Sequence, residues 1–469
     1  MNPLDLREIA RELHAEYHGV ALPIAAVVTD TRGTDTRSIG VGNLYVALRG
    51  EKFDGHDFID AAVASGAVAA VVDHAVKTSI QQLVVDDTRL ALGEIARCNR
   101  RRFKGPVIGI TGSAGKTTCK EMVAAILTRC GSTLATRGNL NNEIGVPLTL
   151  LQIDAGHHYA VIEMGAARAG DIAYLCRFAE PTVGIVTAVM PAHLEGFGSI
   201  DTIARTKGEI FAGLAADGLA VINADEPYLP LWRQLAGTRR VVTFGFDGTD
   251  SDKPDVTARA IVYALEGTRF ELVAPQGRIE INLALLGRHN LRNALAAAAA
   301  TLSVGASLGA VRDGLASLRA VPGRLQPRRG LTGNTVIDDS YNANPGAVKA
   351  AIDVLAGYTG RRLLILGNMA ELGPDSEMLH REVATHAKLR GIEALWLVGP
   401  HAAAMAAEFG AHSVENDVRV FENNEALIAQ IRHTDTADAI LVKGSRSARM
   451  ETVVMALCGG ITGIAAGDH

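Results

Sequence analysis

Residues 111–118 read TGSAGKTT, and their types and spacing suit a loop that holds nucleotide phosphates. Gly112 and Gly115 let the backbone approach an anion closely, while successive N–H groups at a helix N-terminus provide positive charge. Lys116 can reach the β and γ phosphates of a nucleotide, and the Thr117 hydroxyl can ligate Mg²⁺. The segment therefore predicts a site for a nucleoside triphosphate and its metal ion.

One position departs from the general phosphate-loop motif, because Ile110 stands where the motif has its first glycine. A glycine-rich turn with a surface lysine is the alternative interpretation. We favour the phosphate site because a buried strand, the Gly-Lys-Thr run and a helix follow one another in the required order. The strand is expected at Pro106–Ile110, and the helix is expected from Lys116 to a left-handed cap at Gly131.

Two side chains that follow later strands are candidates for binding the metal ion. Glu163 ends a strand expected at Tyr159–Glu163, and a carboxylate beside the phosphate loop is a common Mg²⁺ ligand. His193 comes after the next expected strand, Val183–Val189, and so emerges on the same rim. A histidine in a loop is as often structural, so the residues alone leave the role of His193 open.

Lys207 lies on the apolar face of an expected helix that Ser199 can cap, four residues after Ile203 and four before Phe211. A buried lysine must find a partner or lose its proton through a lowered pKa. Alternatively, only the aliphatic stem is buried and the amine reaches water. An unprotonated amine beside a metal site could take up CO₂ and become a carbamate, an additional anionic ligand. The residues alone leave these alternatives open.

The length of 469 residues exceeds what one hydrophobic core supports and suggests about three domains. The net charge of −5 gives no sign of a nucleic-acid-binding surface. The five cysteines form no C-x-x-C pair, so neither a disulfide framework nor a zinc site is indicated. The N-terminal segment is a charged amphipathic helix, and no window has the roughly 18 apolar residues of a membrane span. We expect a cytoplasmic protein with no membrane or nucleic-acid partner.

The first domain, residues 1–85, is predicted to be a small α/β unit. Strands are expected at residues 25–29, 44–48, 68–72 and 83–85, and a helix at residues 58–65. A polar turn follows the first of these strands, and its Thr31 and Arg32 could hold a diphosphate. A solvated loop is the plainer interpretation of either residue alone.

The second domain, residues 86–320, is predicted to be the nucleotide domain, built around the phosphate loop. Residues 240–286 look rich in β-strand. A long alanine-rich helix then begins near residue 287, and Asn290 and Asn293 lie one turn apart on one face of it. Their amides suit bidentate hydrogen bonds to a base or to loops, although asparagines at a helix start often only cap it.

The third domain, residues 321–469, alternates strands with helices, which is the pattern of a doubly wound, Rossmann-like parallel sheet. Strands are expected at residues 335–338, 363–366, 394–398, 419–421 and 440–442. Ligands of such sheets bind beyond the C-terminal ends of the strands. Polar clusters follow three of these strands, at residues 338–345, 367–373 and 443–446. The predicted fold class is therefore α/β with three domains.

Taken together, these residues make the chain resemble the Mur ligases over essentially its whole length, and within them the MurF type. The marks are the phosphate loop without its first glycine, NLNNEIGVP at 139–147, EMG at 163–165, GRHN at 287–290 with Asn293, DSYNANP at 339–345, His193 and Lys207. The Asp-Asn-Pro-Arg signature of diaminopimelate-adding relatives is absent from the sequence. Folylpolyglutamate synthetases share the ATP-binding motifs, but the first domain here resembles the UDP-binding domain of Mur ligases.

The resemblance implies a role for each of these residues. ATP would be bound by Gly112, Ser113, Ala114, Gly115, Lys116, Thr117, Thr118, Asn290, Asn293, Arg324 and Asp339. Two Mg²⁺ ions would be linked to Thr117, Glu163, His193 and a carbamylated Lys207, and the catalytic residues would be Lys116, His193 and Lys207. Thr31, Arg32, Asn139 and Asn142 would face the UDP-sugar. Asn342, Asn344, Glu371, Lys443 and Ser445 would complete the substrate site, the last three toward the incoming dipeptide.

The resemblance also implies an activity. It is that of a monomeric ATP-dependent amide ligase that adds D-alanyl-D-alanine to UDP-N-acetylmuramoyl-tripeptide through an acyl phosphate, in peptidoglycan precursor synthesis. Two alternatives stay open. One is a related amino-acid ligase that acts on another carboxylate, such as a folate or the preceding peptidoglycan intermediate. The other is a P-loop ATPase that synthesises nothing.

Overall fold

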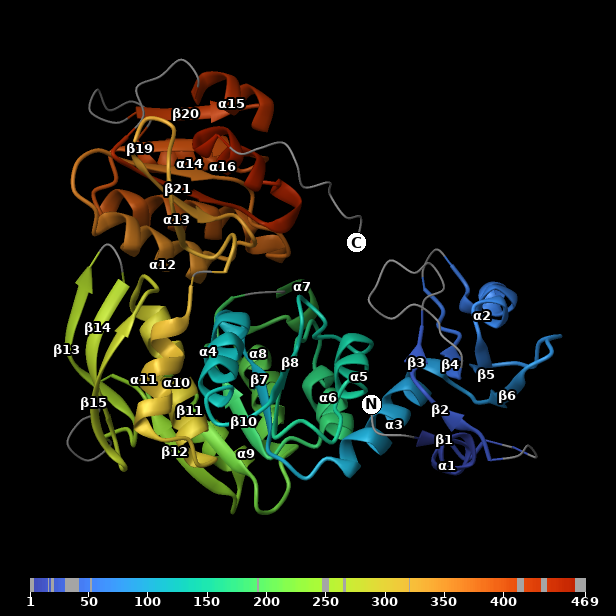
Figure 1. Cartoon of the computed structure of the whole chain (residues 1–469). Helices are drawn as coiled ribbons and strands as arrows, with labels where there is room; N and C mark the ends of the chain where they lie inside the picture. Colours follow the sequence, from blue (N-terminus) through green and yellow to red (C-terminus); the bar gives the residue numbers. More distant parts are fainter. Residues whose placement is uncertain are drawn as a thin grey trace.

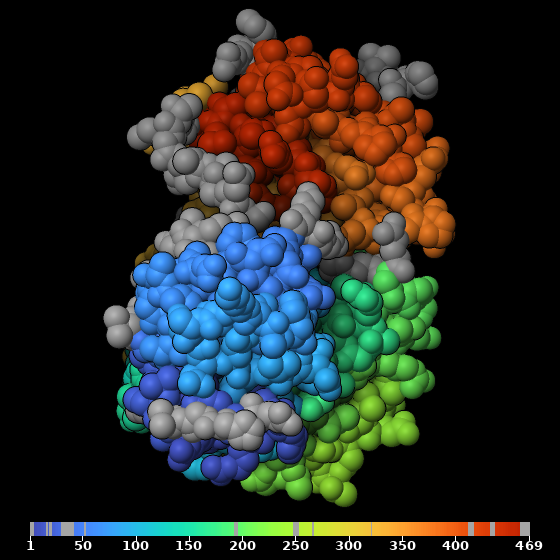
Figure 2. All heavy atoms as spheres, turned by 90° about the vertical axis from the view of Figure 1, so that its right-hand side faces the viewer, coloured from blue at the N-terminus to red at the C-terminus, as the bar shows by residue number. Residues whose placement is uncertain are grey.

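The computed structural model describes residues 4–15, 17, 21–29, 42–50, 53–191, 194–246, 253–264, 267–319, 321–410, 417–431 and 437–459. They form three α/β units, with the N-terminal unit to one side of the central unit and the C-terminal unit above it (Figure 1). Figure 2 shows the N-terminal unit from its own side. The predicted three-domain α/β class is confirmed, whereas the domain boundaries stay predictions.

The N-terminal unit contains a four-stranded parallel sheet with the order β3-β4-β5-β6. Its strands are β3 (Val27–Val28), β4 (Asn43–Val46), β5 (Ala67–Val72) and β6 (Gln81–Val84). Beside it lie β1 (Leu4–Asp5), α1 (Leu6–Glu12), β2 (Pro23–Ile24), the 3-10 turn η1 (Gly55–Phe58) and α2 (Ile59–Ala64). Each strand predicted in this domain is present, with ends shifted by up to two residues.

The central unit is organised around a six-stranded parallel sheet with the order β12-β11-β10-β7-β9-β8. Its strands are β7 (Val107–Thr111), β8 (Thr133–Ala135), β9 (Tyr159–Glu163), β10 (Val183–Val186), β11 (Leu219–Asn223) and β12 (Arg240–Phe244). Its helices are α3 (Thr88–Arg102), α4 (Lys116–Leu127), α5 (Gly145–Leu150), α6 (Asp171–Ala179), α7 (Leu194–Phe197), α8 (Ile200–Ala212), α9 (Leu229–Ala236), α10 (Arg288–Ser303) and α11 (Leu308–Ser317).

Two layers of helices cover this sheet. Alternate residues of a strand face opposite sides, and here both faces carry apolar side chains that the helices bury. In β9, Ala160 and Ile162 enter the core that α3 and α6 close, while Val161 enters the core that α4 and α10 close. The chain passes from β7, in the middle of the sheet, to α4 through residues 112–115. The phosphate loop therefore lies at the C-terminal edge of the sheet, between β9 and β10.

Residues 240–286 are rich in β-strand as predicted, and one detail of the central unit, the end of α4, differs from the sequence prediction. The strand-rich stretch is divided, because β12 joins the parallel sheet while β13 (Thr257–Ala264), β14 (Gly267–Ala274) and β15 (Gly277–Leu283) form a separate antiparallel sheet. Helix α4 ends at Leu127, and Gly131 is not left-handed. The N–H groups of Cys130 and Gly131 both bond the Leu127 carbonyl, at 2.8 and 2.9 Å. These turns satisfy the helix end without a left-handed cap.

The C-terminal unit has the sheet order β16-β17-β21-β18-β19-β20. Its strands are β16 (Gln326–Arg329), β17 (Thr335–Asp339), β18 (Arg362–Leu366), β19 (Ala394–Val398), β20 (Asp417–Phe421) and β21 (Ala439–Lys443). Its helices are α12 (Pro345–Ala356), α13 (Ser376–Leu389), α14 (Ala402–Phe409), α15 (Asn424–Ile431) and α16 (Glu451–Cys458), with short turns η2 (Gly373–Asp375) and η3 (Arg446–Ala448).

All five strands predicted in this unit are present and parallel, and helices cover both faces of the sheet. The doubly wound arrangement is therefore confirmed. The additional strand β16 pairs antiparallel with β17 at the sheet edge. Its sequence, QPRR, is polar and contains proline, which is tolerated at an edge and gives little strand signal. None of the helices in the described ranges is both long and apolar enough to cross a membrane.

Candidate active site

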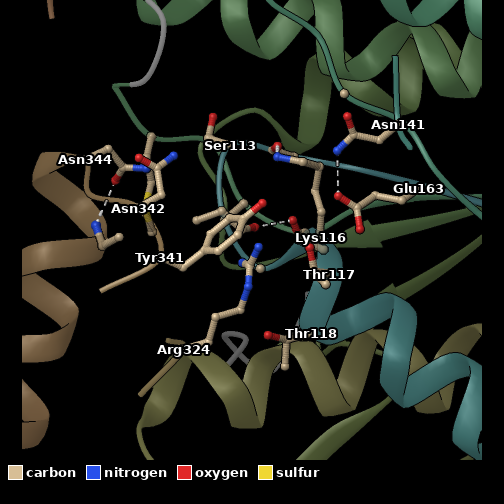
Figure 3. Close-up of a pocket in the computed structure, with 18 of the residues that line it drawn as sticks. Ser113, Lys116, Thr117, Thr118, Asn141, Glu163, Arg324, Tyr341, Asn342 and Asn344 are labelled. Carbon is tan, nitrogen blue, oxygen red and sulfur yellow. Dashed lines mark hydrogen bonds between the residues drawn. The ribbon is translucent and has the colours of Figure 1, made fainter. Parts of the chain in front are cut away.

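A cavity of about 560 Å³ lies where the C-terminal edge of the central sheet faces the C-terminal unit. Its central-unit lining comes from residues 112–118, the loop 138–143, Glu163 and the start of α10. Its other wall includes residues 323–325, 341–344, Asp339 and Lys443. Figure 3 shows side chains from both units converging on this space. The position, beyond the C-terminal ends of parallel strands, is where such sheets bind ligands.

The phosphate loop has the close-packed geometry that its glycines predict. Gly112 and Gly115 both have left-handed backbones, with φ of 146° and 81°. A Cβ atom at Gly112 would lie 2.1 Å from the Thr187 hydroxyl, and one at Gly115 would lie 2.6 Å from the Asn293 amide oxygen. Only glycine fits these positions, because the loop is confined between the end of β10 and α10.

Two polar groups of this loop are ready to receive an anion. The Lys116 amine donates a 2.8 Å hydrogen bond back to the Gly112 carbonyl, so it stays over the loop. The Ser113 hydroxyl is buried and has no partner within the described part of the chain. Buried polar atoms without partners are rare and often mark a ligand position. Burial lowers the pKa of Lys116, while the nearby Glu163 carboxylate opposes that effect.

The residues predicted to bind metal fit a Mg²⁺ ion as far as the structure describes them. Glu163 is 2% exposed, and its Oε1 accepts a 2.8 Å hydrogen bond from the Asn141 amide. Its Oε2 is buried without a partner among the described residues. A bare buried carboxylate oxygen is costly unless a cation approaches it. Thr117 lines the same cavity, and its hydroxyl and this carboxylate are oxygen donors of the kind that Mg²⁺ prefers. His193 lies outside the described residues.

Lys207 is 2% exposed, so the amine is buried together with its stem. The Nζ atom donates a 3.3 Å hydrogen bond to the Ala166 carbonyl and lies 5.4 Å from the centroid of the Phe197 ring. No carboxylate of the described chain forms an ion pair with it. Burial, together with the charge of Lys116, lowers the pKa of Lys207 to about 7, against the opposing carboxylates of Asp171 and Glu209. A large fraction of this amine is therefore unprotonated near neutral pH.

This lowered pKa predicts a pH-dependent stability difference between the wild type and Lys207→Met. The unfolded chain keeps a lysine pKa near 10.5, so between pH 7 and that value the unfolded state binds more protons than the folded state. Wild-type stability should therefore rise with pH relative to the variant. Between pH 7 and pH 9 the change should be about 2 kcal/mol.

Urea unfolding of both proteins at several pH values in CO₂-free buffer measures this difference. Lys104→Met, at an exposed lysine, is the matched control. A difference between wild type and Lys207→Met that is constant over this pH range would contradict the lowered pKa.

The asparagines predicted to contact the nucleotide base are both buried at the start of α10 and line the cavity. The Asn290 amide donates a 2.8 Å bond to the Leu286 carbonyl, and the Asn293 amide lies 3.4 Å from the Asn290 oxygen. Asn290 thus fixes the first turn of α10 to the segment that precedes the helix. The N-cap residue is Gly287 and no side chain caps it, so Asn290 does not cap the helix as the alternative interpretation suggests. Asn293 packs against Gly115 of the phosphate loop. Contact of either residue with a base stays a prediction.

The C-terminal unit contributes a buried charge pair and a half-buried cation. Lys443 lies 2.5 Å from the Asp339 carboxylate and donates a 2.8 Å bond to the Asn342 carbonyl, so its amine fixes the loop after β17. The Arg324 guanidinium lies 4.3 Å from the centroid of the Tyr341 ring, a cation–π contact within the cavity wall. The Tyr341 ring thereby orients Arg324 at the cavity wall.

The remaining predicted substrate residues divide into three groups. Asn139, Asn142, Asn342 and Asn344 line the cavity. Asn142 and Asn344 also accept backbone hydrogen bonds at the starts of α5 and α12. Glu371 and Ser445 are not among the residues that line it. Thr31 and Arg32 lie outside the described residues.

Several cavity residues were not predicted from the sequence. They include Asn141, Asp171, Tyr174, Phe197, Arg292 and Tyr341. Asn141 and Tyr341 lie inside the polar runs NLNNE and DDSYNANP, so the runs themselves were the available signal. Spacing alone does not tell which member of such a run faces the cavity.

Among the described residues, one group outside the cavity has metal-ligand spacing. Ligand atoms of His56, Asp73 and His74 lie within 4.8 Å of one another. Both ring nitrogens of His56 already have partners, the Asp54 carboxylate and the Asp73 N–H. The Arg49 guanidinium lies 3.2 Å from the Asp73 carboxylate. These groups already bond one another, and we interpret the cluster as a structural contact that holds the segments after β4 and β5 together.

Comparisons with known proteins cover all three units. Residues 31–103 match the family model described as Mur ligase family, catalytic domain, residues 110–301 match the Mur ligase middle domain, and residues 323–446 match the Mur ligase, glutamate ligase domain. The chain is 45% identical over 462 residues to UDP-N-acetylmuramoyl-tripeptide--D-alanyl-D-alanine ligase of Escherichia coli (strain K12), covering 97% of this chain and 99% of that protein.

Two solved structures have the same fold over nearly the whole chain. A crystal structure of MurF from Acinetobacter baumannii superposes with a TM-score of 0.89 at 33% identity, covering 98% of this chain and 100% of that one. MurF ligase from Thermotoga maritima in complex with ADP gives a TM-score of 0.81 at 30% identity, covering 92% and 96%. The chain therefore belongs to the Mur ligase family and, within it, to the MurF type.

Proposed function

We propose that this protein joins D-alanyl-D-alanine to the peptide carboxylate of UDP-N-acetylmuramoyl-tripeptide, with cleavage of ATP to ADP and phosphate. The observation that carries the proposal is the cavity in which the phosphate loop, Glu163 and Lys207 meet Arg324 from the C-terminal unit. A relative that is 45% identical has this activity as its name, and a solved relative binds ADP. The reaction is a step of peptidoglycan precursor synthesis.

The chemistry follows from the weakness of a carboxylate as an acyl donor. Its oxygen attacks the γ phosphorus of ATP, the bond to the ADP oxygen breaks, and an acyl phosphate forms. The dipeptide amine then attacks the acyl carbon, loses a proton, and the tetrahedral intermediate expels phosphate to leave the amide. Lys116 and the loop N–H groups would stabilise the charge on the transferring phosphoryl group, which is mainly an electrostatic and positioning task.

Mg²⁺ would be held by Thr117 and Glu163, with His193 and a carbamate on Lys207 for a second ion. Bound there, the metal supplies positive charge to the phosphate oxygens. The bare Oε2 of Glu163 supports the first position. The buried amine of Lys207, with its pKa near 7, supports carbamate formation because only the unprotonated amine adds to CO₂.

Water must be kept from the acyl phosphate, which hydrolyses readily. The cavity is closed on one side by the central sheet and on the other by the segments that carry Arg324, Tyr341 and Asn344. Side chains of the C-terminal unit would therefore help to keep water from the site of phosphate transfer. We assign the dipeptide to this wall and the UDP-sugar to the wall formed by Asn139 and Asn142. Because its nucleotide substrates are soluble, we place the enzyme in the cytoplasm. We also propose that it acts as a monomer.

The test of the function is phosphate release from ATP and Mg²⁺ with each acceptor present or omitted. Release should require both UDP-N-acetylmuramoyl-tripeptide and D-alanyl-D-alanine, and should match the amide product mole for mole, because each amide consumes one acyl phosphate. Turnover of ATP without either acceptor would favour a non-synthetic ATPase. Release that instead depends on a folate acceptor and glutamate would favour a folylpolyglutamate-type ligase.

A further inference from the structure

Asn141 connects the loop between β8 and α5 to the end of β9. Its side-chain amide donates a 2.8 Å hydrogen bond to Glu163 Oε1 (Figure 3). Its backbone carbonyl accepts a 2.7 Å hydrogen bond from the Gly165 N–H. A Cβ atom at Gly165 would lie 2.8 Å from the Asn141 amide oxygen, so the glycine permits this close approach. The loop is thus attached both to the Glu163 carboxylate and to the backbone two residues after it.

In this arrangement the two oxygens of the Glu163 carboxylate have different environments. A carboxylate accepts on both oxygens, and a hydrogen bond to one of them fixes the rotation of the group. Oε1 is occupied by Asn141, whereas Oε2 is buried and has no partner in the described chain. The bond therefore presents one bare oxygen in a constant orientation toward a cation.

The same bond also keeps Glu163 away from the nearest buried cation. Glu163 and Lys116 sense each other electrostatically, yet these two described residues form no ion pair within 4.0 Å. Lys116 is held by the Gly112 carbonyl, and Glu163 is held by Asn141. Without the asparagine, the carboxylate could turn to the lysine, and the two charges needed for metal and phosphate would neutralise each other.

We infer that Asn141 is a positioning residue that holds Glu163 ready for Mg²⁺ and apart from Lys116. The inference rests on the proposed role of Glu163 as a metal ligand. Groups that hydrogen-bond a metal ligand orient it, and their removal weakens metal affinity by about 10- to 100-fold. Asn141 does not touch the nucleotide in this role, so its removal should change metal dependence and leave metal-free nucleotide binding unaltered.

The experiment measures binding of ADP with a fluorescent ribose label, in EDTA and over a Mg²⁺ titration. Asn141→Ala should raise the Mg²⁺ concentration for half-maximal tightening by about tenfold, while the affinity in EDTA equals that of the wild type. Asn141→Ser, which keeps a small polar side chain, serves if the alanine variant does not fold. Asn99→Ala is the matched control, because this buried asparagine bonds the Leu150 and Ile153 carbonyls at the end of α5, away from Glu163.

Glu163→Gln separates failure of the inference from failure of the metal assignment. Loss of Mg²⁺-dependent tightening in Glu163→Gln, with no further loss in the double variant, supports action of Asn141 through Glu163. An unchanged Mg²⁺ titration in Asn141→Ala, or an equal shift in Asn99→Ala, overturns the inference and leaves the metal role of Glu163 standing. An unchanged titration in Glu163→Gln overturns the metal assignment itself.

Discussion

Lys116→Ala is expected to lower kcat for amide formation by about 10³-fold or more, the scale reached when a positive charge is removed from a phosphoryl-transfer site. Lys116 is the first residue of α4, and its amine is held over the phosphate loop by the Gly112 carbonyl. In the reaction it would exchange this carbonyl for phosphate oxygens whose charge is greatest in the transition state. Because the interaction is strongest there, kcat should fall more than KM for ATP rises.

The measurement for Lys116→Ala is the rate of phosphate release with both acceptors, together with the amount of amide product. Lys104→Ala is its control, since this exposed lysine does not line the cavity and its amine donates a hydrogen bond to the Arg101 carbonyl. Lys104→Ala should keep the wild-type rate. A Lys116→Ala enzyme with more than a tenth of that rate would show that the loop lysine is not a principal source of stabilisation.

Much of the fold could be predicted because the local signals agree with one another. The buried strand Tyr159–Glu163 has the predicted bounds, and the Ser199 hydroxyl accepts a hydrogen bond from the Thr202 N–H at the predicted helix start. What the sequence left open, or predicted wrongly, depends on partners distant in the sequence. The strand β12 looks like its antiparallel neighbours but pairs with β11. Gly131 lies in a tight approach to His158, which composition does not reveal.

The site was predictable where chemistry constrains the residue type. A glycine pair followed by lysine and threonine suits few roles besides phosphate binding, and a lysine on an apolar helix face must be either paired or neutral. The structure confirms the burial of Lys207. The site was less predictable where several equivalent side chains adjoin. Three asparagines lie in NLNNE, and only the loop conformation decides that Asn141 bonds Glu163 while Asn142 caps α5.

Two mechanisms differ in the chemical state of Lys207, and they predict different activities for variants at this position. If the protonated amine binds phosphate, Lys207→Arg should keep substantial activity, because arginine supplies the same charge. If a carbamate supplies an anionic ligand, both Lys207→Arg and Lys207→Ala should lose activity by about 10²-fold or more, the scale of losing one electrostatic contact to the reacting group. We expect the second result, since burial favours the neutral amine that adds CO₂.

Chemical rescue tests directly for a carbamate on Lys207, because a carbamate and a small carboxylate present the same pair of oxygens. In Lys207→Ala, removal of the side chain leaves room beside Ala166 and Phe197, and added acetate or formate should restore part of the activity in a saturable manner. Amide formation is measured over a titration of each acid at constant ionic strength. Lys116→Ala, titrated in parallel, should show no rescue, because it lacks a cation. Full activity in Lys207→Arg, or equal rescue of both alanine variants, would exclude the carbamate.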